Sequence, residues 1–164
     1  MTGVIHRRTV LAGGVALLAS PAFAIATAPK VRRLSPALDR IVAPDAAVEV
    51  IATGIQWAEG PLWLDRQHCL LFSDPPANIM RRWSADRGVS IFLEPSGAAG
   101  TDPKRVREPG SNGLAVDRSG DVLIADSGMR AITRLDPRSK RKTMLVDRYR
   151  GKRFNSPNDL HVAK

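Results

Sequence analysis

The feature that most constrains the fold is an internal repeat of short apolar segments. Eight segments of three to five residues, each bounded by turn-forming residues, fall into two sets of four, and this pattern is typical of β-strands. The predicted strands are 62–64, 70–72, 79–83, 89–93, 114–116, 122–125, 131–135 and 143–146. Four short strands that recur about every 45 to 55 residues predict the blades of a β-propeller.

The register of this repeat can be read from the sequence. Residues 59–63 align with residues 112–116 at an offset of 53, and Asp74 aligns with Asp126 at an offset of 52. Residues 158–162 align with residues 112–116 at an offset of 46, which predicts a third inner strand. A two-sheet sandwich also has short, evenly spaced strands, but it does not predict similar polar residues at the same point of each repeat. The sequence therefore favours an all-β propeller, with about two blades and the start of a third.

Polar residues stand at the start of the innermost strand of each repeat, at Glu59, Asn112 and Asn158. Because the innermost strands of a propeller line its central channel, these side chains are expected to face one another. One carboxylate and several amide oxygens suit a hard cation such as Ca²⁺ or Mg²⁺. Asparagine is also common in turns, so the spacing alone leaves a metal site and a turn role equally open.

The first 24 residues have the pattern of an export signal. Arg7 and Arg8 precede an apolar stretch at residues 10–19, which is too short to span a bilayer, and small residues follow at positions 22–24. The paired arginines resemble a twin-arginine signal, with an ordinary secretory leader as the alternative. The pattern predicts a bacterial periplasmic or secreted protein that uses the twin-arginine export machinery and is not attached to a membrane after signal removal.

The segment after this signal, residues 25–47, contains three prolines and is predicted to be a linker. Ser35-Pro36 is expected to open one short helical turn within it, because proline suits the first helical position.

The net charge of +9 is concentrated in one segment, residues 138–153. Tyr149 is the only aromatic residue among them, and one aromatic ring makes a poor platform for stacked bases. We therefore predict a solvated strand edge and loop, and no nucleic-acid partner. Polyanion binding through this segment is the alternative.

Three segments, residues 57–63, 110–117 and 153–160, together resemble the family of gluconolactonase, regucalcin (senescence marker protein) and luciferin-regenerating enzyme. The resemblance extends from about Val48 to the end of the chain. It implies a six-bladed propeller with one divalent cation in its channel, calcium first and zinc, magnesium or manganese as alternatives. It also implies hydrolysis of small esters, most often sugar lactones, so a small-molecule lactone is the expected partner.

The resemblance also assigns roles to individual residues. The family's metal-binding glutamate corresponds to Glu59, and the asparagine before Asp159 corresponds to Asn158, as a metal or substrate contact. Asn112 is expected to contact the substrate. Asn155 is a rival to Asn158, and the repeat register favours Asn158.

The sequence departs from the family pattern in its length. Six blades need roughly 270 to 300 residues, so residues 48–164 are expected to be the N-terminal part of the propeller. The family's general-base aspartate is then expected beyond Lys164, and the 164-residue chain is expected to be inactive alone. The competing hypothesis is a propeller without catalysis, which acts as a binding or scaffold module.

Overall fold

The computed structural model describes residues 31–100, 102 and 106–163, which belong to two compact units, Met1–Glu49 and Val50–Lys164. The predicted export signal and the first residues of the predicted linker lie outside the described residues. Within the described part, no helix has the length and apolar character that a membrane span requires.

The first unit contains a short 3-10 helix, η1 (Pro36–Arg40). Ser35 caps it, because its hydroxyl oxygen accepts a hydrogen bond from the amide of Ala37 at 3.2 Å. Proline at the first helical position has no amide hydrogen to leave unpaired. The predicted helical turn at Ser35-Pro36 is confirmed.

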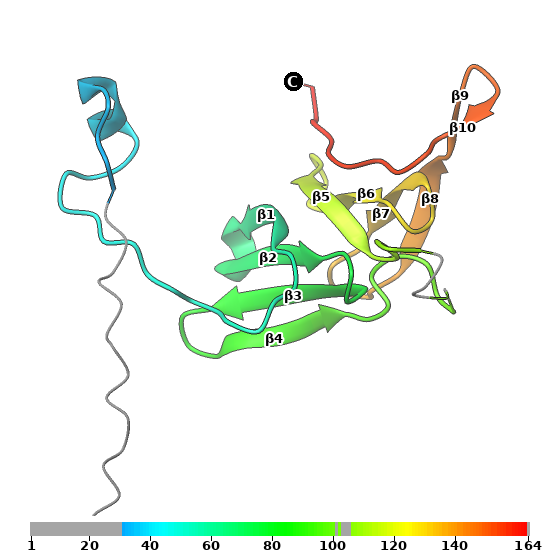
Figure 1. Cartoon of the computed structure of the whole chain (residues 1–164), viewed down its shortest axis with the longest axis horizontal. Coiled ribbons are helices and arrows are strands. Elements are labelled where there is room, and N and C mark those ends of the chain that lie inside the picture. Colours follow the sequence, from blue (N-terminus) through cyan, green and yellow to red (C-terminus); the bar gives the residue numbers. More distant parts are fainter. Residues whose placement is uncertain (1–30, 101, 103–105, 164) are drawn as a thin grey trace, which may run out of the picture. The chain divides into compact units, whose positions relative to one another are not determined.

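The second unit is all-β and contains two four-stranded antiparallel sheets and a small hairpin (Figure 1). The first sheet has β1 (Glu59–Leu64), β2 (Cys69–Asp74), β3 (Ile79–Ser84) and β4 (Gly88–Leu93), with the 3-10 turn η2 (Asp65–Gln67) after β1. The second sheet has β5 (Ser111–Val116), β6 (Val122–Asp126), β7 (Ala131–Leu135) and β8 (Lys142–Val146), and the hairpin pairs β9 (Arg148–Tyr149) with β10 (Lys152–Arg153). All eight predicted strands are confirmed, whereas the hairpin was not predicted.

The two sheets share the predicted register. Leu62 pairs with Leu71 in the first sheet, and Ala115 pairs with Leu123 in the second, which reproduces the offsets of 53 and 52. Both inner strands have an irregular register, between Glu59 and Leu62 in β1 and between residues 111 and 114 in β5. A β-bulge bends a strand and changes the direction of its side chains, and here it falls at the predicted polar position.

The core lies between the two sheets, where β1 packs against β5. Its buried side chains come from both sheets and are Leu64, Cys69, Leu71, Met80, Leu114, Val122, Ile124 and Leu135. Burial of one such leucine or isoleucine side chain contributes about 1.5 to 3 kcal/mol. The core therefore holds the two inner strands against each other.

The predicted strand at residues 158–162 does not form in the described structure. This segment runs beside β5 (Figure 1). There the amide of Gly113 donates a hydrogen bond to the carbonyl of Asn158 at 2.8 Å. A strand requires a ladder of such bonds, and this contact alone does not make one.

The basic segment, residues 138–153, is exposed over most of its length, but the predicted solvated strand edge is wrong at Lys142. Only 17% of this side chain is exposed, and its ammonium group lies 2.9 Å from the carboxylate of Asp126. The buried carboxylate draws the lysine inward, because a buried charge requires a partner.

Candidate functional site

The three predicted site residues, Glu59, Asn112 and Asn158, line one recess of about 360 Å³. We call it the inner recess, and its lining consists of Glu59, Gly60, Pro61, Asn112, Gly113, Leu114, Asn158 and Asp159. Three segments far apart in the sequence meet here, namely the start of β1, the start of β5 and the segment after β10. The structure therefore brings together all three residues, and Asn155 is not among the residues that line the recess.

Two glycines permit this convergence. A Cβ atom on Gly60 would collide with the backbone of residues 112–114, and one on Gly113 would collide with Asp159 and the Asn158 carbonyl. Gly60 also has a φ of +54°, in the left-handed region that favours glycine. No role was predicted for these two glycines, although a glycine follows the polar residue in the first two repeats.

Asn112 is the most buried polar side chain of the three, with 2% of its surface exposed. Its Nδ2 donates a hydrogen bond to Oδ1 of Asn158 at 3.0 Å. Its Oδ1 is buried and accepts no hydrogen bond within the described structure. Because an unsatisfied buried acceptor costs about 1 to 3 kcal/mol, this atom points to a ligand that supplies a donor or a positive charge.

The chemistry of the inner recess fits a hard divalent cation. Its possible ligands are the carboxylate of Glu59 and the amide oxygens of Asn112 and Asn158, and oxygen ligands suit Ca²⁺ or Mg²⁺ better than Zn²⁺. The described residues contain no group of three or more His, Cys, Asp or Glu residues that could hold a metal ion. A cation in this recess would therefore depend on the two asparagines.

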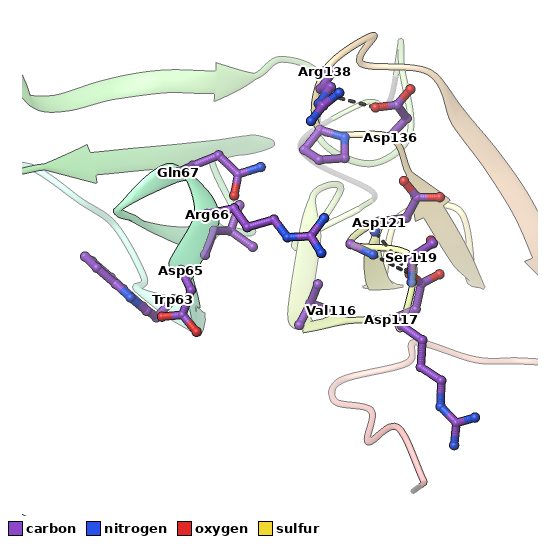
Figure 2. A pocket seen from close by; sticks show the side chains of 14 residues that line it. Trp63, Asp65, Arg66, Gln67, Val116, Asp117, Ser119, Asp121, Asp136 and Arg138 are labelled. Carbon is purple, nitrogen blue, oxygen red and sulfur yellow. Dashed lines mark hydrogen bonds between the residues drawn. The ribbon is translucent and has the colours of Figure 1, made fainter.

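A larger pocket of about 530 Å³ lies at the opposite ends of β1 and β5 (Figure 2). Its charged side chains belong to turns. The Asp117 carboxylate accepts hydrogen bonds from the Ser119 hydroxyl and from the amides of residues 119–121, and the Ser119 contact in particular lowers the pKa of Asp117. Asp136 accepts a hydrogen bond from the amide of Arg138 in the same way. We assign the site to the inner recess, because the turn contacts account for these side chains without a ligand.

A family model described as the SMP-30/Gluconolactonase/LRE-like region matches residues 57–164. The chain belongs to this family. A curated gluconolactonase from Zymomonas mobilis subsp. mobilis is 54% identical over 136 residues, which cover 82% of this chain and 38% of that protein. The chain is therefore similar to a named member of the SMP-30/gluconolactonase/LRE-like family over most of its length.

Solved structures of this family agree with the fold. The structure of a gluconolactonase from Xanthomonas campestris superposes with a TM-score of 0.67 at 33% identity and covers 86% of this chain and 42% of that chain. A second structure, from a structural-genomics programme, has the same TM-score of 0.67 at 26% identity, covering 82% of this chain and 42% of that chain. The two sheets are blades of the propeller fold, and the chain spans about two-fifths of the length of the relatives it matches.

Proposed function

We propose that this protein belongs to the lactone-hydrolysing members of the family and acts on small esters, above all sugar lactones, with one divalent cation in the inner recess. The observation that carries the proposal is the buried Oδ1 of Asn112, which has no partner within the described structure and lies in a recess lined by Glu59 and Asn158. The similarity to curated and solved gluconolactonases supports a lactone as the substrate class.

The residues of the inner recess would have different roles in binding the cation and the substrate. The Glu59 carboxylate and the amide oxygens of Asn112 and Asn158 would hold the cation, with Asn112 and Asn158 also available to the substrate. A divalent cation, Ca²⁺ first, supplies polarisation of the lactone carbonyl when bound there. The Nδ2 of Asn112 holds the side chain of Asn158 in one orientation through its hydrogen bond, so the two amides act as one unit.

The general base is a separate part of the proposal. The family resemblance assigns this role to an aspartate, and none of the described residues is placed in that role here. We propose that the 164-residue chain binds the cation but needs further sequence for turnover.

The paired arginines at Arg7 and Arg8 support a further proposal, that the protein is exported to the periplasm through the twin-arginine machinery.

Calcium titration of the chain by isothermal calorimetry tests the metal site. We expect one Ca²⁺ to bind and Glu59→Gln to weaken binding about tenfold or more, because it removes the one negative charge among the proposed ligands. Glu94→Gln is the matched control, since Glu94 is exposed and does not line the recess. If the wild-type chain binds none of Ca²⁺, Mg²⁺, Mn²⁺ or Zn²⁺, the metal site is wrong and a non-catalytic propeller becomes the better explanation.

A lactonase assay tests the reaction. A version that carries additional family sequence after Lys164 is expected to release acid from glucono-δ-lactone, and the 164-residue chain is expected not to do so. If the longer version binds the cation but leaves lactones intact, the proposed activity is wrong and the proposed metal site stands.

A further inference from the structure

We propose that Arg130 is a positioning residue for Asn158, and that Asn78 has the same role for Asn112. Each occupies the turn between the second and third strands of its blade, and each holds the segment of chain that leads to the next asparagine of the inner recess. The inference rests on the proposed function, because the position of these asparagines matters only if they bind a ligand.

Arg130 connects the second blade to the segment that ends at Asn158. Its Nε donates hydrogen bonds to the carbonyl oxygens of Phe154 and Asn155, at 2.7 and 3.0 Å. The residue is half-buried and has a φ of +58°, a left-handed conformation that is unusual for a residue with a side chain. This backbone conformation belongs to the turn, and the side chain leaves the turn toward the connecting segment.

Further contacts carry the constraint from residue 155 to Asn158. The Ser127 hydroxyl donates to the carbonyl of Pro157 at 2.9 Å. The amide of Gly113 donates to the Asn158 carbonyl at 2.8 Å, and Asn112 Nδ2 donates to the Asn158 side chain at 3.0 Å. The route to Asn158 is therefore fixed at four of its five last residues, and Arg130 makes the first two of these contacts.

Asn78 occupies the equivalent position in the first blade. It precedes Arg130 by 52 residues, the same offset as between Asp74 and Asp126, and it also has a φ of +58°. Its Nδ2 donates to the carbonyl of Ala98 at 2.8 Å, and its Oδ1 accepts from the amide of Gly97 at 2.8 Å.

The held segment of the first blade also continues to the inner recess. The Ser96 hydroxyl oxygen accepts a hydrogen bond from the amide of Ser111 at 3.0 Å, directly before Asn112. An amide and a guanidinium thus make the same kind of contact at equivalent positions. We infer that the side chain at this turn position of each repeat holds the connecting segment that follows, and that Arg130 has this positioning role in the second blade.

The test compares Arg130→Met with Arg134→Met. Arg134 also lies on the β6–β7 hairpin and is an exposed arginine that pairs with Asp117 at 3.2 Å, so its loss controls for charge. Calcium affinity is measured by calorimetry, and hydrogen exchange of the Asn112 side-chain amide is measured by NMR. We expect Arg130→Met to weaken Ca²⁺ binding about tenfold, as loss of an outer-shell contact does, and to accelerate this exchange, while Arg134→Met matches the wild type.

Arg130→Lys provides a second, milder variant, because a lysine can reach one carbonyl at a time. We expect intermediate Ca²⁺ affinity and intermediate exchange, and the same two readouts decide the matter if Arg130→Met does not fold. A folded variant with wild-type affinity and wild-type exchange would overturn the proposal. If the wild-type chain binds none of Ca²⁺, Mg²⁺, Mn²⁺ or Zn²⁺, the proposed metal site fails, while the exchange of the Asn112 amide still decides whether Arg130 positions Asn158.

Discussion

The two blades place a fully buried aspartate at the same point but use it differently. In the first blade, Asp74 accepts hydrogen bonds from the amides of Gln56 and Trp57, at 3.3 and 3.2 Å, and pairs with Arg81 at 3.3 Å. It therefore holds the chain that leads into β1 and to Glu59. The Asp74 carboxylate thus helps to fix the position of Glu59, which lies on the inner strand of the same blade.

In the second blade, Asp126 accepts a hydrogen bond from the amide of Met129 and pairs with Lys142, both at 2.9 Å. Lys142 also donates to the carbonyls of Ser96 and Gly97, in the connection from the first blade. The same buried charge here joins two blades. A repeated sequence position thus preserves a buried acceptor, while the partners of that acceptor differ with the neighbouring segment.

The inner strands differ in burial as well. Asn112 on β5 is almost fully buried, because β1 covers one side and the segment around Asn158 covers the other, whereas Glu59 on β1 is half-buried. A buried carboxylate costs far more than a buried amide. Glu59 thus keeps its charge where water can reach it, while the neutral Asn112 side chain lies inside.

The largest expected effect comes from the glycine that lets the two blades meet. Gly60→Ala is expected to destabilise the chain by roughly 3 kcal/mol or more, since left-handed strain of about 1 to 2 kcal/mol adds to a backbone collision. Gly88→Ala is the matched control, with a φ of +64° and open space around the missing Cβ, and should cost only about 1 kcal/mol. Urea unfolding measures both, and equal losses would show that close contact of β1 with β5 is not required.

The two buried aspartates provide the next comparison. Asp126→Asn should destabilise by about 2 to 3 kcal/mol, because it leaves the largely buried Lys142 without a counter-charge. Asp74→Asn should cost about 1 to 2 kcal/mol, because Arg81 is more distant and an asparagine oxygen can still accept one amide bond. Urea unfolding of both variants tests this order, and a larger loss for Asp74→Asn would contradict the assigned roles.

Local pattern and repetition explain what the sequence could predict. Strand boundaries follow from alternating apolar residues and turns, and the offset from Asp74 to Asp126 follows from comparing repeats. The grouping of Glu59, Asn112 and Asn158 in one recess also followed from repeat register, because equivalent positions of successive blades lie side by side. Asn158 reached that recess without the strand that was predicted around it.

Contacts between blades could not be predicted in the same way. The roles of Gly60 and Gly113 depend on how closely two inner segments approach each other. The contacts of Arg130 depend on the path of the chain at Phe154, which lies 24 residues later in the sequence. Lys142 stood among solvated basic residues in the sequence, and only the buried Asp126 distinguishes it. Such contacts join residues that are far apart in the sequence, and no local sequence pattern indicates that these residues will meet.

A smaller effect on stability, with a clear effect on binding, is expected for Asn112→Leu. Leucine has a similar volume and removes the unpartnered buried acceptor, so the free energy of unfolding should stay within about 1 kcal/mol of the wild type. Calcium affinity should fall about tenfold or more, because an oxygen ligand is lost and Asn158 loses its donor. Urea unfolding tests the expected stability, and calorimetry tests the expected Ca²⁺ affinity. A large loss of stability with unchanged Ca²⁺ affinity would mean that Asn112 is only a structural residue.

The smallest effect concerns Lys140, which reaches from the β7–β8 turn of the second blade onto the Phe92 ring of the first, 2.8 Å from its centre. Burial and then the charge of Arg82 lower the pKa of Lys140 from 10.5 to about 8, against opposing contributions from Cys69 and Asp136. Because the unfolded chain then binds more protons than the folded chain between these pH values, stability should rise from about pH 8 to about pH 10.5.

Lys140→Met should remove this part of the pH dependence, and it should be more stable relative to the wild type below pH 8 than above pH 10.5. The exposed Lys152→Met provides the control for loss of one positive charge. Urea unfolding at several pH values between 7 and 11 measures the difference. If Lys140→Met and Lys152→Met change the pH profile equally, the contact between the two blades does not lower the pKa of Lys140.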